Sequence, residues 1–220
     1  IISATNEAGV IKAIEHKEKS IFGQMWHPER ENPFSKPQLL LIQEFFNENV
    51  SKIISIAKSA SEKIIEIYNN DFRVNYKEDE SPGTKADIKA NKIIVDKLNK
   101  ISNYPVLTEE NPVEYKVRKN WNKFWLVDPL DGTKDFISKN GQFTVNISLI
   151  VNKEPILGVI CVPITGDIYY AIRNGGTFKN GVKIFNNSKR KQLIGCDSNF
   201  HSSKKTNFFF KKQNVNKIEK

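Results

Sequence analysis

The stretch WLVDPLDGT, residues 125–133, joins an apolar segment to two carboxylates, a proline and a glycine turn. Residues 124–127 are apolar and predict a buried strand. Pro129 fixes its own φ angle and has no backbone N–H to donate, so we expect the strand to stop there. The polar residues that follow are therefore predicted to gather at the end of a buried strand.

Two aspartates and a carbonyl at this strand end form a set of oxygen ligands. Asp128 and Asp131 flank the carbonyl of Leu130. Gly132 lets the backbone approach a ligand closely and leaves its N–H available. Mg²⁺ prefers such oxygen atoms and is usually held by a few carboxylates together with a substrate phosphate. The alternative interpretation is an ordinary Asp-Gly turn with two solvated carboxylates.

The surrounding motifs resemble one protein family. Residues 125–149 read WLVDPLDGTKDFISKNGQFTVNISL, residues 81–87 read SPGTKAD, and residues 106–110 read VLTEE. Together they resemble the inositol monophosphatase superfamily, and within it the 3'(2'),5'-bisphosphate nucleotidase branch. The motifs occur in the family's order, and PILGVICVP at residues 155–163 extends the match. The resemblance covers roughly residues 50–200.

The resemblance implies an α+β fold in which helices cover a mainly antiparallel sheet, the N-terminal domain of the inositol monophosphatase-like (sugar phosphatase) fold. Apolar periodicity predicts helices over residues 53–67 and 84–101, with a polar loop between them. Thr84 and Asp87 have the spacing of a capping box. Predicted strands cover residues 105–108, 124–127, 143–151, 155–162 and 167–172. Short connections predict that the last three strands are antiparallel neighbours.

A metal centre is also implied by the resemblance. It would hold two or three Mg²⁺ ions: Glu109, Asp128 and the Leu130 carbonyl would bind one, and Asp128 and Asp131 would share in the second. A pair of such ions can clamp the attacking and leaving oxygens of a phosphate ester and activate a bound water. Glu110 is interpreted as a solvated neighbour of Glu109.

The remaining site residues follow from the same resemblance. Thr133, paired with Asp87, would position the attacking water, and Glu109 is the third predicted catalytic residue. Asp87 alone could equally be a helix cap. The N–H groups of Gly132 and Thr133 would meet the phosphate, because a turn entering a helix can bind anions. Lys134 either steers a polyanionic substrate or is simply solvated. The predicted substrate-binding residues are Glu109, Leu130, Asp131, Gly132 and Thr133.

The function implied by the resemblance is that of a Mg²⁺-dependent phosphoric monoester hydrolase. Its substrate would be the small molecule adenosine 3',5'-bisphosphate, cleaved to AMP and phosphate. Two alternatives stay open. One is an inositol or sugar phosphatase, because the family's substrate-reading half has no match in the sequence. The other is a non-catalytic fusion remnant that retains part of a metal site.

The first part of the chain, residues 1–49, has a separate character. Residues 21–29, IFGQMWHPE, resemble the C-terminal end of class I glutamine amidotransferases. By position, His27 would be the base of a Cys-His-Glu triad and Glu29 its orienting acid. A triad also needs a thiol, and that family's cysteine lies upstream of the histidine, whereas both cysteines here lie downstream. We interpret this part as an amidotransferase remnant; a surface loop is the alternative.

Composition limits the classes of function. No apolar run approaches the length needed to cross a bilayer, and no secretory signal is visible. Cys161 and Cys196 indicate reduced thiols rather than a disulfide framework, which favours a cytoplasmic protein. Residues 189–220 carry +7 of the net charge of +9. A basic, Asn- and Ser-rich end of this kind is typical of a solvated segment and does not indicate nucleic-acid binding.

The chain divides by pattern into residues 1–49, the metal-binding domain at 50–188 and the basic tail at 189–220. In the resembling family a second domain with a Trp-Asp-x-Ala-Ala-Gly motif follows, and no such motif occurs here. We therefore expect a C-terminally truncated chain with impaired activity. The three phenylalanines at residues 208–210 resemble a core-facing piece whose partners are missing, so we expect unpartnered apolar side chains that make the chain prone to association.

The missing upstream thiol yields a first prediction. Glutamine hydrolysis by the purified chain should be undetectable in an assay of ammonia release, because no nucleophile can attack the amide. His27→Ala should leave phosphate-ester hydrolysis unchanged. A measurable glutaminase rate would contradict this interpretation of the motif.

Overall fold

The structure of the chain is a computed structural model. It describes residues 2–5, 11–15, 22–24, 36–70, 74–76, 82–185, 194–200, 203–213, 215 and 217–219. Side chains are described for residues 50–70, 84–185, 194–200, 203–213 and 215. His27 and Glu29 lie outside the described residues.

The helices are α1 (Lys36–Tyr68), α2 (Lys85–Ile101), α3 (Tyr115–Arg118), α4 (Thr133–Ile137) and α5 (Lys204–Lys212). The strands outside the main sheet are β1 (Ile2–Thr5), β2 (Ile11–Glu15), β3 (Phe22–Gln24), β4 (Val74–Tyr76), β5 (Pro82–Thr84), β13 (Ile194–Cys196) and β14 (Lys217–Glu219). The main sheet contains β6 (Val106–Thr108), β7 (Lys123–Asp131), β8 (Thr144–Val151), β9 (Glu154–Val162), β10 (Asp167–Ile172), β11 (Gly176–Lys179) and β12 (Val182–Ile184).

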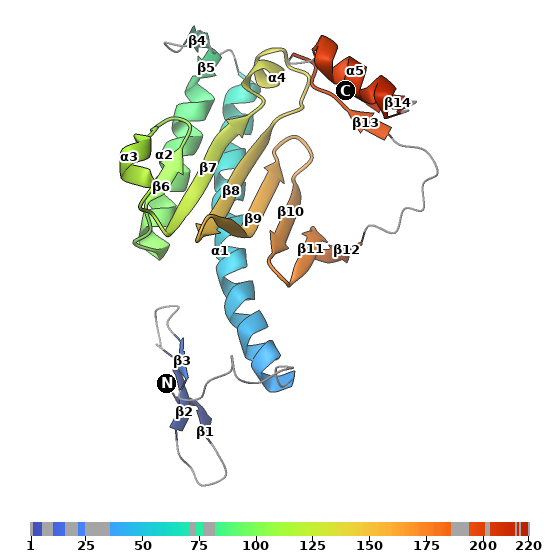
Figure 1. Cartoon of the computed structure of the whole chain (residues 1–220). Helices are drawn as coiled ribbons and strands as arrows, with labels where there is room; N and C mark the ends of the chain where they lie inside the picture. The colour runs from blue at the N-terminus through green and yellow to red at the C-terminus, as the bar shows by residue number, and fades with distance from the viewer. Residues whose placement is uncertain are drawn as a thin grey trace.

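The main sheet has the strand order β12-β11-β10-β9-β8-β7-β6. Its neighbours are antiparallel except for β6 and β7, which are parallel. Helices α1 and α2 lie side by side against one face of the sheet (Figure 1). This arrangement confirms the predicted α+β fold and the predicted antiparallel neighbours.

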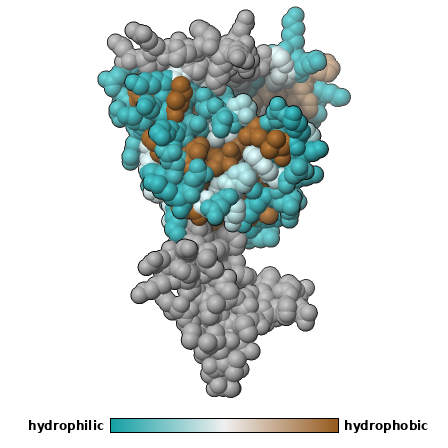
Figure 2. All heavy atoms as spheres, turned by 90° about the vertical axis from the view of Figure 1, so that its left-hand side faces the viewer, coloured by the Kyte–Doolittle hydropathy of each residue, from teal (hydrophilic) through white to brown (hydrophobic). Residues whose placement is uncertain are grey.

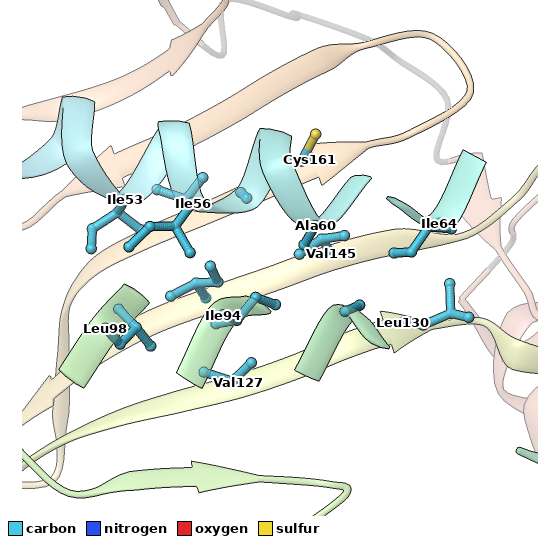
Figure 3. Close-up of a cluster of buried hydrophobic side chains, with 14 of the residues drawn as sticks. Ile53, Ile56, Ala60, Ile64, Ile94, Leu98, Val127, Leu130, Val145 and Cys161 are labelled. Carbon is cyan, nitrogen blue, oxygen red and sulfur yellow. The ribbon is translucent and has the colours of Figure 1, made fainter. Parts of the chain in front are cut away.

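The core lies between the two helices and the sheet (Figure 3). Ala57 and Ala60 of α1 and Ala90 of α2 are fully buried, and their small side chains let the helices approach closely. Along β7 the side chains alternate: Trp125 and Val127 are buried against the helices, whereas Leu126 is 43% exposed on the opposite face. One face of the sheet is thus covered by helices.

An aromatic cluster fixes the segment that follows β7. The rings of Phe136 in α4 and Phe143 before β8 lie 5.2 Å apart. The ring of Tyr68, at the end of α1, lies 5.2 Å from the first and 5.0 Å from the second. Edge and tilted contacts at such distances are favourable. The turn at residues 131–133 is therefore attached to α1.

One side of the molecule carries α2, α3 and β6. Figure 2 shows a band of apolar side chains there, bordered by hydrophilic ones. Exposed apolar residues of these elements include Ile88, Ile101 and Val117. Among the described residues, no helix is both long and apolar enough to cross a membrane.

Several predictions about elements need correction. Helix α1 is continuous from Lys36 to Tyr68, so the predicted boundary at residue 49 falls inside it. The predicted polar loop between the helices contains the antiparallel pair β4 and β5. The basic tail contains α5, which Ser203 caps by accepting a hydrogen bond from the Thr206 N–H. The β4–β5 pairing and the cap of α5 are features that hydrophobic periodicity does not register.

The phenylalanines of α5 do not behave alike. Phe208 and Phe209 are 70% and 57% exposed, which agrees with the prediction of unpartnered apolar side chains. Phe210 lies against Gly195 of β13, where an added Cβ would come within 3.0 Å of its ring. Phe210 therefore differs from the prediction in having a packing partner, because consecutive side chains on a helix point in different directions.

The core assignment can be tested at Ile94 of α2, which is fully buried between this helix, α1 and β7. Ile94→Ala should lower the free energy of unfolding by about 2–5 kcal/mol through lost burial and a residual cavity. Ile88→Ala on the same helix removes a 57% exposed side chain and should change it by less than about 0.5 kcal/mol. Urea denaturation compares the two, and equal losses would contradict the packing.

Candidate metal and phosphate site

Strand pairing brings the acidic residues to one edge of the sheet. Because β6 and β7 are parallel, with Thr108 opposite Val127, their carboxyl ends meet at the same edge. Glu109 follows β6 directly, and Asp128 is the next residue of β7. The Asn111 N–H donates to the buried Thr108 Oγ1 at 3.0 Å, which closes a tight turn around Glu109. Glu109 is exposed and Glu110 is half-buried.

The predicted end of the strand at Pro129 is wrong. β7 continues to Asp131, and its pairing with β8 shifts register between Asp128 and Asp131. Asp128 is opposite Asn146 and Asp131 is opposite Thr144, so two residues of β7 face one residue of β8. This is a β-bulge, which accommodates a proline that cannot donate to the ladder. Both aspartates therefore belong to β7, one on each side of the bulge.

Asp128 is the central carboxylate. Its Oδ1 accepts a hydrogen bond from the Leu130 N–H at 3.3 Å. Burial, together with the negative charges of Asp131, Glu109 and Asp87, raises the pKa of Asp128 to about 7 against the opposing effect of that hydrogen bond. The four predicted acidic residues therefore lie close enough to repel one another.

Asp87 caps α2 and also contacts Thr133. It is buried at the start of α2, and its Oδ2 accepts hydrogen bonds from the Thr84 N–H at 2.7 Å and from Thr84 Oγ1 at 2.6 Å. The predicted capping box is confirmed. Its other oxygen, Oδ1, accepts from Thr133 Oγ1 at 3.2 Å. The predicted pairing of Asp87 with Thr133 is present across 46 residues of sequence.

The turn after β7 is tightly constrained at Gly132. Its φ is +90°, a conformation that side chains disfavour. An added Cβ would lie 2.8 Å from the Gln142 carbonyl oxygen, so no other residue fits without movement. Thr133 begins α4 immediately afterwards, and its hydroxyl also reaches the Leu130 carbonyl at 3.3 Å. Lys134 is exposed.

Two residues of this site were missed by the sequence analysis. Asn146 Nδ2 donates to Asp131 Oδ2 at 3.1 Å, and Thr144 Oγ1 donates to Asn146 Oδ1 at 3.1 Å. The signal was the alternation of Thr144, Asn146 and Ser148 with buried apolar residues in β8, which indicates a polar strand face.

The donor set is compatible with Mg²⁺. Carboxylates and a carbonyl are the oxygen ligands this ion prefers, and the raised pKa of Asp128 reflects its burial and neighbouring negative charges, which a cation would offset. Within the described part of the chain, no three Asp, Glu, His or Cys side chains converge tightly enough to form a ready-made cage. Each ion would therefore be completed by carbonyl, water and phosphate oxygens, which is the usual manner for Mg²⁺.

Depressions on the surface do not all coincide with this site. One of about 780 Å³ lies at the opposite end of the sheet, around Glu154, Arg173 and Lys183, and contains none of the predicted residues. A mostly apolar groove of about 440 Å³ starts beside Asp128 and Asn146 on the helix-free face. We place the site by its carboxylates, because the chemistry of the groups decides more than the volume of a depression.

Comparison with known proteins identifies similar chains. Residues 47–219 match the Inositol monophosphatase family. The chain is 43% identical over 125 residues to the 3'(2'),5'-bisphosphate nucleotidase CysQ of Salmonella typhimurium, covering 56% of this chain and 51% of that protein. It is 45% identical over 133 residues to the protein of the same name from Buchnera aphidicola, covering 59% and 50%. The chain thus spans about half the length of these curated relatives.

Solved structures similar to this chain include members of the same family. The crystal structure of CysQ from Bacteroides thetaiotaomicron, a bacterial member of the inositol monophosphatase family, is similar with a TM-score of 0.66 and 35% identity. The similarity covers 79% of this chain and 72% of that one. An IMPase from Thermotoga maritima has the same TM-score at 22% identity, which shows a shared fold.

The raised pKa of Asp128 predicts how the metal-free protein responds to pH. A carboxyl whose pKa is higher in the folded state than in the unfolded state stabilises the fold at low pH, and this contribution is lost as pH rises from about 4 to about 7. Asp128→Asn removes the free-energy cost of keeping a charged carboxylate at this position of the folded protein. In EDTA at pH 8 it should raise the free energy of unfolding by about 1–2 kcal/mol after allowance for solvent screening.

Denaturation in urea at pH 8 and pH 4.5 measures this difference, which should shrink at the lower pH. Asp96→Asn is the control, since Asp96 is an exposed residue paired with Lys92 on α2. A destabilised Asp128→Asn protein at pH 8 would show that the carboxylates do not repel one another.

Proposed function

The chain belongs to the inositol monophosphatase family, and from this premise we propose that it is a Mg²⁺-dependent phosphoric monoester hydrolase of the 3'(2'),5'-bisphosphate nucleotidase type. The observation that carries the proposal is the convergence of Asp87, Asp128, Asp131 and Glu109 at the carboxyl end of β7, with the pKa of Asp128 raised to about 7. A cluster of like charges of this kind is favourable when cations neutralise it.

The metal ligands in this proposal are Glu109, Asp128 and the Leu130 carbonyl for one ion, with Asp128 and Asp131 sharing in a second. When bound, such ions supply a Lewis acid and an activated water near neutral pH. The residues of the chain hold this arrangement in place. The Leu130 N–H orients Asp128, and the β-bulge brings Asp131 to the same edge.

The attacking water would be oriented by Thr133. Its hydroxyl proton is directed to Asp87 Oδ1 at 3.2 Å or to the Leu130 carbonyl at 3.3 Å. A hydroxyl that donates in this way presents its lone pairs outward, where they can accept a hydrogen bond from water. Asp87 can hold Thr133 because the Thr84 N–H and hydroxyl fix its other oxygen.

The phosphate would bind at the turn after β7. The positive φ of Gly132 leaves no side chain over the backbone there, and Thr133 begins a helical turn. The N–H groups of Gly132 and Thr133 can then meet phosphate oxygens. Lys134, exposed beside them, is the candidate for attracting a polyanionic substrate.

The proposed substrate is adenosine 3',5'-bisphosphate, hydrolysed to AMP and phosphate. It is supported by the similarity to proteins named 3'(2'),5'-bisphosphate nucleotidase. An inositol or sugar monophosphatase is the second candidate, since the matched family is named for inositol monophosphatase. A non-catalytic chain that only binds metal is the third, and the match to about half of the relatives' length is the observation that favours it.

We propose two further properties of the chain. Residues 1–49 are proposed to be an amidotransferase-like part, in agreement with a family match that begins at residue 47. A cytoplasmic location is proposed because Cys161 and Cys196 are both free thiols.

The test is phosphate release from adenosine 3',5'-bisphosphate, inositol 1-phosphate and fructose 1,6-bisphosphate, each with Mg²⁺ and with EDTA. The first substrate should react fastest, and only with Mg²⁺. Asp128→Asn should weaken Mg²⁺ binding at least about tenfold and lower the rate about 10²–10³-fold. Glu110→Gln is the matched control and should change both by less than about threefold.

The three candidates give different outcomes. Preference for inositol 1-phosphate or fructose 1,6-bisphosphate would replace the nucleotidase assignment. Mg²⁺ binding that depends on Asp128, without hydrolysis of any of these substrates, would support the non-catalytic chain. Calorimetry that shows equal Mg²⁺ affinity in Asp128→Asn and Glu110→Gln would contradict the proposed metal centre itself.

A further inference from the structure

The helix-free face of β8 contains polar residues next to the acidic cluster. Thr144, Asn146 and Ser148 alternate with the buried residues Val145 and Ile147. They therefore share the face opposite the helices. Asn146 lies directly opposite Asp128, and Thr144 lies opposite Asp131. The β-bulge in β7 thus brings two acidic side chains beside two neutral ones.

The hydrogen bonds along this face have a defined direction. Asn146 Nδ2 donates to Asp131 Oδ2 at 3.1 Å. Thr144 Oγ1 donates to Asn146 Oδ1 at 3.1 Å. A carboxylate only accepts hydrogen bonds, so the amide must turn its NH₂ group toward Asp131, and its oxygen then faces the hydroxyl of Thr144. Each contact favours the same orientation of the amide.

Asp131 needs such a partner more than Asp87 does. Asp87 is buried and held by Thr84, whereas Asp131 is exposed, follows the bulge and precedes the positive-φ Gly132. An exposed side chain loses rotational freedom when it is fixed in one orientation. A hydrogen bond to Oδ2 removes part of this cost before a cation binds and leaves Oδ1 as the second oxygen.

The neutrality of the partner is chemically important. A lysine or arginine at position 146 would also orient Asp131, but its charge would compete with a cation for the same carboxylate. An amide orients the carboxylate and leaves its charge in place. Neutral groups in the layer around metal ligands commonly act in this manner.

We propose that Asn146, itself oriented by Thr144, is a positioning residue that presents the Asp131 carboxylate to a divalent cation. This role rests on the proposed metal-dependent function. It deepens that proposal by extending the site from β7 to β8. Asn146 acts through Asp131 and need not touch the ion or the substrate.

The experiment measures Mn²⁺ affinity of the full chain by titration calorimetry, for the parent protein and for Asn146→Ala. The variant should bind Mn²⁺ about 10–100-fold more weakly. Ser148→Ala is the matched control: Ser148 lies on the same strand and face but donates to the Leu157 carbonyl at 2.9 Å, so its affinity should stay within about twofold. Melting temperatures in EDTA report whether each variant is folded.

A second pair of variants tests the orientation of the amide without a large change in shape. Thr144→Val removes the hydroxyl and should weaken Mn²⁺ binding, whereas Thr144→Ser retains it and should restore the affinity. If the parent hydrolyses its substrate, the loss in Asn146→Ala should be recovered at high Mg²⁺ concentration. A role confined to folding would not show recovery by metal.

The possible results separate this inference from the proposed function. A parent protein that binds Mn²⁺ together with an Asn146→Ala protein that binds it equally well would overturn the positioning role alone. Equal affinities of Thr144→Val and Thr144→Ser would overturn the part assigned to Thr144. A parent protein that binds no Mn²⁺ would overturn the metal centre and this role with it.

Discussion

Strand pairing around the β7 bulge holds like charges together, and the proposed chemistry depends on this constraint. Parallel pairing with β6 places Glu109 beside Asp128, while the shifted pairing with β8 keeps Asp131 on the same edge. Left to electrostatics, these carboxylates would separate; burial and the charges of its neighbours together raise the pKa of Asp128 to about 7. Cations at this cluster would offset the repulsion between the carboxylates.

Neutral hydrogen-bond donors keep this cluster ordered. The Leu130 N–H donates a hydrogen bond to Asp128, and the Asn146 amide donates one to Asp131. Asp87 accepts hydrogen bonds from the N–H and the hydroxyl of Thr84. None of these donors brings a positive charge that would compete with a metal ion. The same residues that complete local structure, a helix cap and a strand bulge, therefore also orient the groups that would bind the ion.

The layers behind the site supply its rigidity. Helices α1 and α2 cover one face of the sheet, and the aromatic contacts of Tyr68 with Phe136 and Phe143 attach the turn at Gly132 to α1. An error of about 1 Å in the placement of a catalytic group can cost about a hundredfold in rate. The relationship to the inositol monophosphatase family places this layered unit within residues 47–219.

The sequence by itself determined the features that depend on near neighbours in the chain. The capping box of Thr84 and Asp87 spans one helical turn, and the apolar periods of α2 and β10 appear directly in the residues. Only the tertiary structure decided the bulge at Pro129, the hydrogen bond from Asn146 to Asp131 and the raised pKa of Asp128. The physical reason is register: the alternation in β8 indicates that Asn146 lies on the polar face, but which residues of β7 lie opposite it depends on the shifted pairing of two strands, which no local pattern specifies.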